Sequence, residues 1–422
     1  MKSIEYTLKN GLRVIHNQKV NSKIVDVRIK LGAGNFYNNY NGYTPGVAHF
    51  VEHVVHDKTE KYKSKEELTS IVTDLGGARN ASTSPNEMMT FFATVIKEYS
   101  ESACDYVSQV VFHSNFEQDA VNKHKKIIKE ELLSYLKAPS KKSWDLFKNL
   151  AYEGTNFVFD TLGTEESIEA LQLDELRKYY KERFTLQNSI LVVSGDISLG
   201  KCKKVVDKYF SKIKQNNNST NFVEDIDNIP KIHNKRQGCV LITDKQAVVN
   251  FGTILGGFDK PEFFNTLVLL KFLTATSNSI LTKKLREENH LVYGISSNIF
   301  GNQLSSIAYF NLNVQPENIQ QCLDIIRHEI NEVALGKITE EDLNKTRKRI
   351  EAFEIFNNQS IQDESNYNSS VRLLYRDIKN RDEYVQKILD VSLEDVKGAA
   401  KWLYENLNIL AVCSNVENKY NF

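Results

Sequence analysis

A polar, low-complexity segment near the middle of the chain limits what the sequence can fold into. The run Gln215–Thr220 contains only glutamine, asparagine, serine and threonine, and residues of mixed charge follow it. Such a segment cannot bury enough apolar surface to join a packed core. We therefore expect an N-terminal domain at residues 1–215, a linker at 216–235 and a C-terminal domain at 236–422.

The two halves are weakly alike in layout, which indicates a structural repeat. In the first half the strand-like run Ile24–Leu31 leads through glycines into a helical segment, and in the second half Ala247–Leu255 leads through glycines into the apolar helix Phe264–Leu273. The first run alternates apolar and polar residues, which predicts a sheet with one buried face. We expect an α+β fold of two similar domains, each an antiparallel sheet covered by helices.

The charge balance and the apolar runs argue against several classes of protein. Lys plus Arg and Asp plus Glu both number 54, so the formal net charge is zero and nothing favours a nucleic-acid partner. No stretch approaches the roughly 18 consecutive apolar residues of a membrane span, and Met1–Tyr6 is polar. The five cysteines lack the paired spacing of disulfides or zinc sites. We expect a cytoplasmic protein with no membrane span.

Two histidines and a glutamate are spaced for metal chemistry. His49 and His53 are four residues apart, with Glu52 directly before the second histidine, so on a helix the three side chains share one face. Neutral imidazoles are good zinc ligands, and a glutamate between them can deprotonate a water. The order matches the inverted form of the His-Glu-x-x-His motif. The alternative is a helix with histidines on a solvated face. An apolar stripe on the other side predicts packing on a core: Val47, Phe50, Val51, Val54 and Val55.

A catalytic zinc normally has three protein ligands, so the motif leaves one to be found. The best candidates are Glu130 and Glu131 in a predicted helix, Val121–Leu136. Helical phase places Glu131 on an inward stripe and Glu130 on a charged face. An inward carboxylate needs a partner, and a metal would be one. We favour Glu131 and keep Glu130 as the alternative. The inward stripe consists of Ile127, Ile128, Leu132 and Tyr135.

With these residues the chain resembles the pitrilysin, insulinase and mitochondrial processing peptidase family of zinc peptidases. The resemblance covers nearly the full length of the chain and rests on five segments in the same order, which is more specific than one motif. These segments are Leu8–Val14, Gly46–His53, Gly76–Ser84, Leu162–Ile168 and Leu285–Tyr293.

The resemblance implies a role for each motif residue. It implies His49, His53 and Glu131 as the ligands of one zinc ion per chain, and Glu52 as the general base. The family's spacing from the second histidine is usually 76 or 77 residues. Glu130, at 77, meets this spacing and Glu131, at 78, exceeds it by one, so Glu130 stays open.

Two positions near the motif depart from the family's pattern. Seven residues before Glu131, where the family often has a glutamate that tunes the metal, this chain has His124. His56 stands where an aromatic or apolar residue is usual. It either touches the metal site or is a surface or hydrogen-bonded histidine.

The resemblance also implies residues that hold the substrate. Asn80 and Ala81 match an edge strand that pairs with the backbone of an extended peptide. Arg286 and Tyr293 match a pair in the second half that clamps the substrate carbonyl and stabilises the oxyanion. Without the resemblance these would be a loop-to-strand junction, a surface arginine and a core aromatic.

We therefore expect a zinc metalloendopeptidase that hydrolyses unfolded or extended peptides with a water activated by the metal and by Glu52. In the family, four such domains form a clamshell around the substrate, and this chain supplies two, so we expect a dimer. The motif and the Arg286/Tyr293 pair occur together, which favours a homodimer over a heterodimer with a related subunit. The alternative function is a non-catalytic or partner-dependent scaffold or processing subunit of the same fold.

Overall fold

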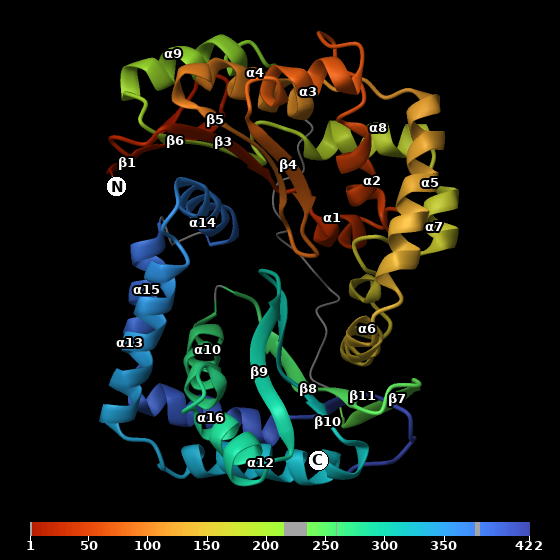
Figure 1. Ribbon diagram of the computed structural model, residues 1–422, viewed down its shortest axis with the longest axis vertical. Coiled ribbons are helices and arrows are strands. Elements are labelled where there is room, and N and C mark those ends of the chain that lie inside the picture. The colour runs from red at the N-terminus through yellow and green to blue at the C-terminus, as the bar shows by residue number, and fades with distance from the viewer. Residues whose placement is uncertain (1, 215–233, 259, 376–379) are drawn as a thin grey trace. The chain divides into compact units, whose positions relative to one another are not determined.

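The computed structural model divides the chain into two compact units (Figure 1). It describes residues 2–214, 234–258, 260–375 and 380–422. Unit 1 comprises Met1–Leu133, Phe159–Asp225 and Asn357–Arg381, and unit 2 comprises Ser134–Val158, Ile226–Phe356 and Asp382–Phe422. Within the described part of the chain, no helix is long and apolar enough to cross a membrane.

Unit 1 is built on a six-stranded sheet. Its strands, in spatial order, are β1 (Lys2–Thr7), β2 (Arg13–Gln18), β6 (Ser189–Gly195), β3 (Ile24–Leu31), β5 (Met89–Ile96) and β4 (Ala78–Thr83). All neighbours are antiparallel except β2 and β6, which run parallel. Because β4 ends the order, one side of its backbone has no neighbouring strand among the described residues.

Helices cover both faces of this sheet (Figure 1). A large apolar core lies between one face and the helices of the N-terminal half, and α14 (Ile361–Leu374) packs on β3 and β6 from the other face. The helices of the N-terminal half in unit 1 are α1 (Asn35–Tyr40), α2 (Val47–Val54), α3 (Lys65–Thr73), α4 (Ser100–Phe112), α5 (Gln118–Tyr135), α7 (Glu165–Ala170), α8 (Leu173–Arg183) and α9 (Leu199–Phe210).

Unit 2 repeats the arrangement of unit 1, which confirms the predicted repeat. Its sheet has the order β7 (Arg236–Leu241), β11 (Ile409–Ser414), β8 (Ala247–Gly256), β10 (Ser305–Val314) and β9 (Val292–Gly301). This order corresponds strand by strand to β2, β6, β3, β5 and β4, with the same directions. Its helices are α6 (Pro139–Tyr152), α10 (Pro261–Thr274), α11 (Ile280–Thr282), α12 (Ile319–Ala334), α13 (Glu340–Phe356), α15 (Arg381–Leu389) and α16 (Leu393–Asn406).

The α+β class is therefore confirmed, but the two sheets are mixed rather than purely antiparallel. In each unit the last strand, β6 or β11, lies parallel to the first strand of the repeat, β2 or β7. Parallel neighbours need a long crossover connection. The connections are long in both units, because residues 19–188 separate β2 from β6 and residues 242–408 separate β7 from β11.

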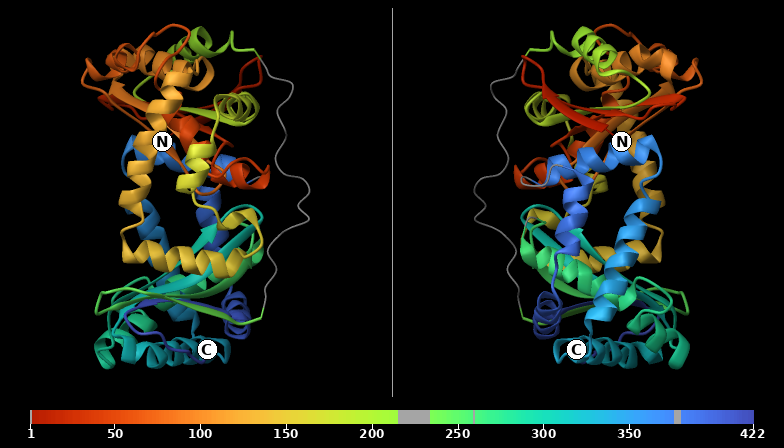
Figure 2. Two further views of the ribbon diagram at one scale, coloured as in Figure 1. Left: turned by 90° about the vertical axis from the view of Figure 1, so that its right-hand side faces the viewer. Right: turned by 90° about the vertical axis from the view of Figure 1, so that its left-hand side faces the viewer.

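Each half of the chain contributes one helix to the other unit. In the first half, α6 packs on the sheet of unit 2 (Figure 2). Its residues Phe147 and Ala151 belong to a core cluster that includes Ile254 and Ile409. In the second half, α14 packs on the sheet of unit 1. The compact units therefore differ from the contiguous domains expected at residues 1–215 and 236–422, because these two equivalent helices are exchanged.

The expected linker, residues 216–235, lies outside the described residues except for its last two positions, Asn234 and Lys235. Nothing in the structure therefore tests that assignment.

The prediction that β3 buries only one face is wrong. Its polar residues Asp26, Arg28 and Lys30 are 0%, 6% and 3% exposed, because α14 covers them. Nε of Arg28 lies 3.3 Å from Oδ2 of Asp26, and Nζ of Lys30 donates to Oγ of Ser370 on α14 at 2.5 Å. A helix from a distant part of the chain thus satisfies a polar row that looks solvated in the sequence.

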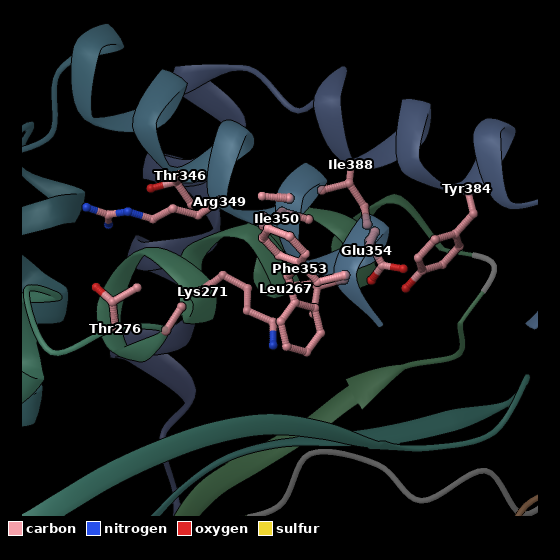
Figure 3. Close-up of a pocket in the computed structure, with 13 residues that line it drawn as sticks. Leu267, Lys271, Thr276, Thr346, Arg349, Ile350, Phe353, Glu354, Tyr384 and Ile388 are labelled. Carbon is pink, nitrogen blue, oxygen red and sulfur yellow. The ribbon is translucent and has the colours of Figure 1, made fainter. Parts of the chain in front are cut away.

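Unit 2 contains a pocket of about 490 Å³ among α10, α13 and α15 (Figure 3). Its lining is mainly apolar, with Lys271, Arg349 and Glu354 as charged members. None of the residues predicted for the metal or substrate site lines it.

Candidate metal centre

The start of α2 is fixed by two glycines with positive φ. Gly46, at the N-cap of α2, has φ +93°, and a Cβ there would lie 2.9 Å from the carbonyl oxygen of Leu162. Gly163 has φ +74°, and its Cβ would lie 2.5 Å from the carbonyl oxygen of Pro45. Only glycine tolerates both the conformation and the contact. The segments that begin at Gly46 and at Leu162 are far apart in the sequence but pack against each other here, and each supplies a glycine to the contact.

The apolar side of α2 packs on the core, as predicted. Val47, Phe50, Val51 and Val54 are fully buried in the core of unit 1, which confirms the apolar stripe. His49 and His53 lie against Glu131 of α5, and Glu52 contacts Thr83 of β4.

His49, His53 and Glu131 form one cluster. Nε2 of His49 lies 3.3 Å from Nε2 of His53. The carboxylate of Glu131, on α5, lies 3.8 Å from Nε2 of His49 and 3.6 Å from Nε2 of His53. Within the described ranges, this is the group of His, Cys, Asp or Glu side chains whose ligand atoms converge closely enough for a metal ion.

The donor set fits zinc. A tetrahedral ion with bonds of about 2.0–2.1 Å to nitrogen separates its ligand atoms by about 3.3 Å. The two Nε2 atoms have this separation, and the carboxylate oxygens are only slightly farther away. Two nitrogens and one oxygen leave room for a fourth ligand, as in catalytic rather than structural zinc sites.

Glu130 is not a member of this cluster. The face of α5 that packs on the core carries Val121, His124, Ile128 and Leu132, and Glu131 lies at its margin with a side chain 47% exposed. The inward stripe expected from sequence was therefore wrong in part, because Ile127 and Tyr135 are exposed.

Burial tunes the ionisable groups of the centre. It lowers the pKa of His49 to about 4 and that of His53 to about 3, with neighbouring positive groups adding to the second shift. Both imidazoles are thus neutral at pH 7, the form that binds metals. Burial also raises the pKa of Glu52 to about 7, and a hydrogen bond from Oγ1 of Thr83 to Oε2, 2.6 Å long, opposes this rise. Thr83 was not predicted from sequence, and nothing in its local pattern marks it.

His56 belongs to the core rather than to the metal cluster. It is 8% exposed, its Nδ1 lies 3.2 Å from the hydroxyl of Tyr106, and its ring packs near Phe91. Of the two alternatives for His56, the structure supports the hydrogen-bonded histidine.

His124, on α5, lies next to the cluster. Its ring centroid is 5.5 Å from that of His53, and its Nε2 lies 2.9 Å from Oδ2 of Asp57. Asp57 follows the end of α2 and was not predicted from sequence.

Asn80 and Ala81 lie in β4, the edge strand next to α2. They pair with Phe92 and Phe91 of β5, and the other side of β4 is free of strands among the described residues. The last residue of β4 is Thr83, which binds Glu52. An edge that accepts an extended peptide would therefore lead to the motif glutamate.

Arg286 and Tyr293 lie in unit 2, whereas the metal cluster lies in unit 1. Arg286 belongs to a π-helical turn, Lys283–Glu288, and its guanidinium lies 5.1 Å from the ring centroid of Tyr293 at the start of β9. Tyr293 is 83% exposed, so it is not a core aromatic. The two residues do form a pair, and their part in catalysis stays a prediction.

The fold and the cluster define a class of protein, that of the inverted His-x-x-Glu-His zinc peptidases and their relatives. Comparison with family models narrows this class. Residues 13–165 match the model described as Insulinase (Peptidase family M16), and residues 170–350 match that described as Peptidase M16 inactive domain. The chain belongs to peptidase family M16, the insulinase family.

Individual relatives agree with this assignment. The chain is 25% identical over 416 residues to an uncharacterized zinc protease, YmxG, of Bacillus subtilis, covering 97% of each chain. It is 22% identical to a probable mitochondrial-processing peptidase subunit beta of Arabidopsis thaliana, covering 82% of this chain and 66% of the relative. A solved structure of a peptidase M16 inactive domain from Pseudomonas fluorescens superimposes with a TM-score of 0.86 at 16% identity, over the full length of both chains.

Proposed function

We propose that the protein is a zinc metalloendopeptidase that hydrolyses unfolded or extended peptides. The observation that supports this most is the convergence of His49, His53 and Glu131. Glu52 lies on the same helix as the two histidines. When bound at these ligands, zinc would polarise a peptide carbonyl and acidify a water molecule in the site.

The protein's own residues then have separate tasks. Glu52 accepts a proton from the attacking water at a carboxylate oxygen and passes it to the nitrogen of the leaving amine. Thr83 donates to Oε2 of Glu52 and so fixes the orientation of the carboxylate. Arg286 and Tyr293 are proposed to bind the carbonyl oxygen as negative charge develops on it.

The substrate is proposed to bind as an added strand. The edge of β4 that has no neighbouring strand in the described chain offers backbone groups of the Asn80–Ala81 segment to an extended peptide. Backbone pairing reads little side-chain sequence and requires an unfolded segment, which favours peptides over folded proteins as substrates.

We further propose that two chains act together. One relative is named as a subunit of a mitochondrial processing peptidase. The family resemblance implies that four such domains enclose the substrate, twice the number in this chain. The motif and the Arg286/Tyr293 pair occur in one chain, which favours a homodimer, and a heterodimer with a related subunit is the alternative. Sedimentation of an active species at the mass of one chain would contradict both.

A non-catalytic subunit of the same fold is the second candidate. The match of residues 170–350 to an inactive-domain model favours it. The complete ligand set in the first half argues against it, because a scaffold does not need converging metal ligands.

Zinc content and peptide cleavage, measured on matched variants, test the proposal. We expect about one zinc per chain in the wild type and cleavage of a quenched fluorescent peptide. Glu52→Gln should keep zinc but lose about 10²–10⁴-fold in rate, and Glu131→Gln should lose zinc.

Glu130→Gln is the control and should change neither quantity. Undiminished cleavage by Glu52→Gln would contradict the assigned base. A wild type with neither zinc nor activity, even after zinc is added, would favour the non-catalytic subunit.

A further inference from the structure

The metal ligands come from two helices, so the geometry of the centre depends on how α2 and α5 are held together. α2 carries His49 and His53, and α5 carries Glu131. A shift of one helix relative to the other would change the distances between the imidazoles and the carboxylate. A contact that fixes α2 against α5 close to the ligands therefore affects metal binding directly.

Asp57 and His124 make such a contact. Asp57 lies in the turn that closes α2, where its backbone N–H donates to the carbonyl of Val54. His124 lies on α5, seven residues before Glu131, which is two helical turns away on the same side. Nε2 of His124 lies 2.9 Å from Oδ2 of Asp57, and because a carboxylate only accepts, this nitrogen carries the proton.

The pair is buried and lies against a ligand ring. The side chains of His124 and Asp57 are 2% and 13% exposed. The rings of His49, His53 and His124 form an edge-to-face row, with centroids 4.6 Å apart at 68° and then 5.5 Å apart at 70°. His53 is thus held between the other ligand and a histidine that Asp57 orients. Nδ1 of His124 finds no hydrogen-bond partner within the described structure, so its one strong polar contact there is the bond to Asp57.

We propose that Asp57 and His124 are a positioning pair that joins α2 to α5 and holds His53 in its metal-binding orientation. The pair acts through His53 and Glu131 and does not itself bind the metal, since it lies outside the converging ligand group. This inference rests on the proposed function, because it assumes that the cluster binds zinc.

The experiment measures zinc affinity by competition with a chromophoric chelator, together with the visible spectrum of the cobalt-substituted protein. His124→Ala and Asp57→Ala should each weaken zinc binding about 10–100-fold and alter the cobalt spectrum. Because the two residues act as one unit, the double variant should bind no more weakly than the worse single variant. His124→Gln, which can still donate to Asp57, should retain more of the affinity than His124→Ala.

Lys123→Ala is the matched control. Nζ of Lys123 lies 3.5 Å from Oδ1 of Asp57, but this side chain is 55% exposed, so its loss removes surface charge without removing the buried contact. It should leave zinc affinity unchanged. Circular dichroism of the metal-free variants separates an effect on the centre from a loss of fold. Should His124→Ala not fold, Asp57→Ala, which leaves the buried ring in place, carries the same expectation.

Two results would overturn the inference. If the wild type binds zinc and both folded alanine variants bind it equally tightly with an unchanged cobalt spectrum, the pair has no positioning role, and the proposed peptidase stands. If the wild type binds no zinc at all, the proposed function fails, and the inference fails with it.

Discussion

Thr83 is the residue that connects the proposed substrate strand to the proposed base. It is the last residue of β4, and its hydroxyl donates to Oε2 of Glu52 at 2.6 Å. A hydrogen bond to a charged group contributes about 1.5–3 kcal/mol. If it holds the carboxylate in its working orientation, Thr83→Val should lower kcat about tenfold or more while zinc content stays at the wild-type level.

Thr83→Ser keeps the hydroxyl and serves as the control, so its kcat should stay near that of the wild type. Steady-state kinetics on one peptide, with zinc measured in the same samples, makes the comparison. A valine variant with unchanged kcat would show that Thr83 is only part of the strand.

Lys30 gives a prediction about pH and stability. Its burial under α14, with Arg28 nearby, lowers the pKa of its ammonium group to about 7. The unfolded state therefore binds more protons than the folded state between pH 7 and about 10, so the free energy of unfolding rises with pH in this window. Lys30→Met lacks this contribution. Its stability advantage over the wild type should be largest at pH 7 and should shrink toward pH 9.5.

Denaturant unfolding at several pH values measures this difference. Lys204→Met, which replaces an exposed lysine of α9, is the control and should show no pH-dependent difference from the wild type. A Lys30→Met advantage that stays constant from pH 7 to 9.5 would contradict the assigned cause.

Site residues could be predicted from sequence where they form a pattern with their neighbours along the chain. The histidines and glutamate of α2 form a pattern within five residues. Glu131 rather than Glu130 lies next to the histidines, as favoured, but the inward stripe used to favour it was wrong in part, because Ile127 and Tyr135 are exposed. Asp57 and Thr83 could not be found, because a lone aspartate or threonine becomes significant only through a partner brought to it by the fold.

At the scale of elements, the position of α2 depends on the loop before α7. Gly163 has a positive φ and lies against Pro45, so a methyl group there meets a backbone oxygen at 2.5 Å. Gly163→Ala should cost about 3 kcal/mol of stability through backbone strain and overpacking. It should also weaken zinc binding, since the N-terminus of α2 would have to move.

Gly76→Ala is the matched control, because Gly76 also has a positive φ, +70°. Apart from Gly76 and its two chain neighbours, no described residue has a heavy atom within 4 Å of the position that a methyl group would take there. It should cost about 1 kcal/mol and leave zinc affinity unchanged. Thermal unfolding and chelator competition give the two quantities. Equal losses in both variants would show that the contact with Pro45 is unimportant.

Helices and strands could be predicted where the spacing of apolar residues within one segment indicates its type. The strand at Ile24–Leu31 and the helix at Val47–Val54 were expected from their patterns, and both are present. The environment of β3 was not predictable from its own residues. Apolar and polar side chains alternate in β3, and the same alternation is expected whether the polar face is solvated or covered by a polar helix. Here α14, from the other half of the chain, covers that face.

At the scale of the whole molecule, the exchange of α6 and α14 makes each compact unit depend on both halves of the chain. The sheet of unit 1 needs α14 to cover Asp26, Arg28 and Lys30, and the core of unit 2 needs Phe147 of α6. The boundary expected from composition falls mostly on residues outside the described ranges, so it stays a prediction. The exchange could not be predicted from sequence, because an amphipathic helix does not specify which of two similar sheets it covers.

The exchange predicts how fragments of the chain behave. Residues 1–214 expressed alone would leave the polar row of β3 without α14 and the apolar face of α6 without its sheet, and residues 234–422 alone would leave α14 exposed and unit 2 without α6. Each fragment should therefore be insoluble or unfold without a cooperative transition. Co-expressed, the two should form a stable one-to-one complex that binds zinc, which size-exclusion chromatography and elemental analysis would detect. Two contiguous domains would give the opposite result, with each fragment folding cooperatively alone, so an independently stable 1–214 fragment would contradict the exchange.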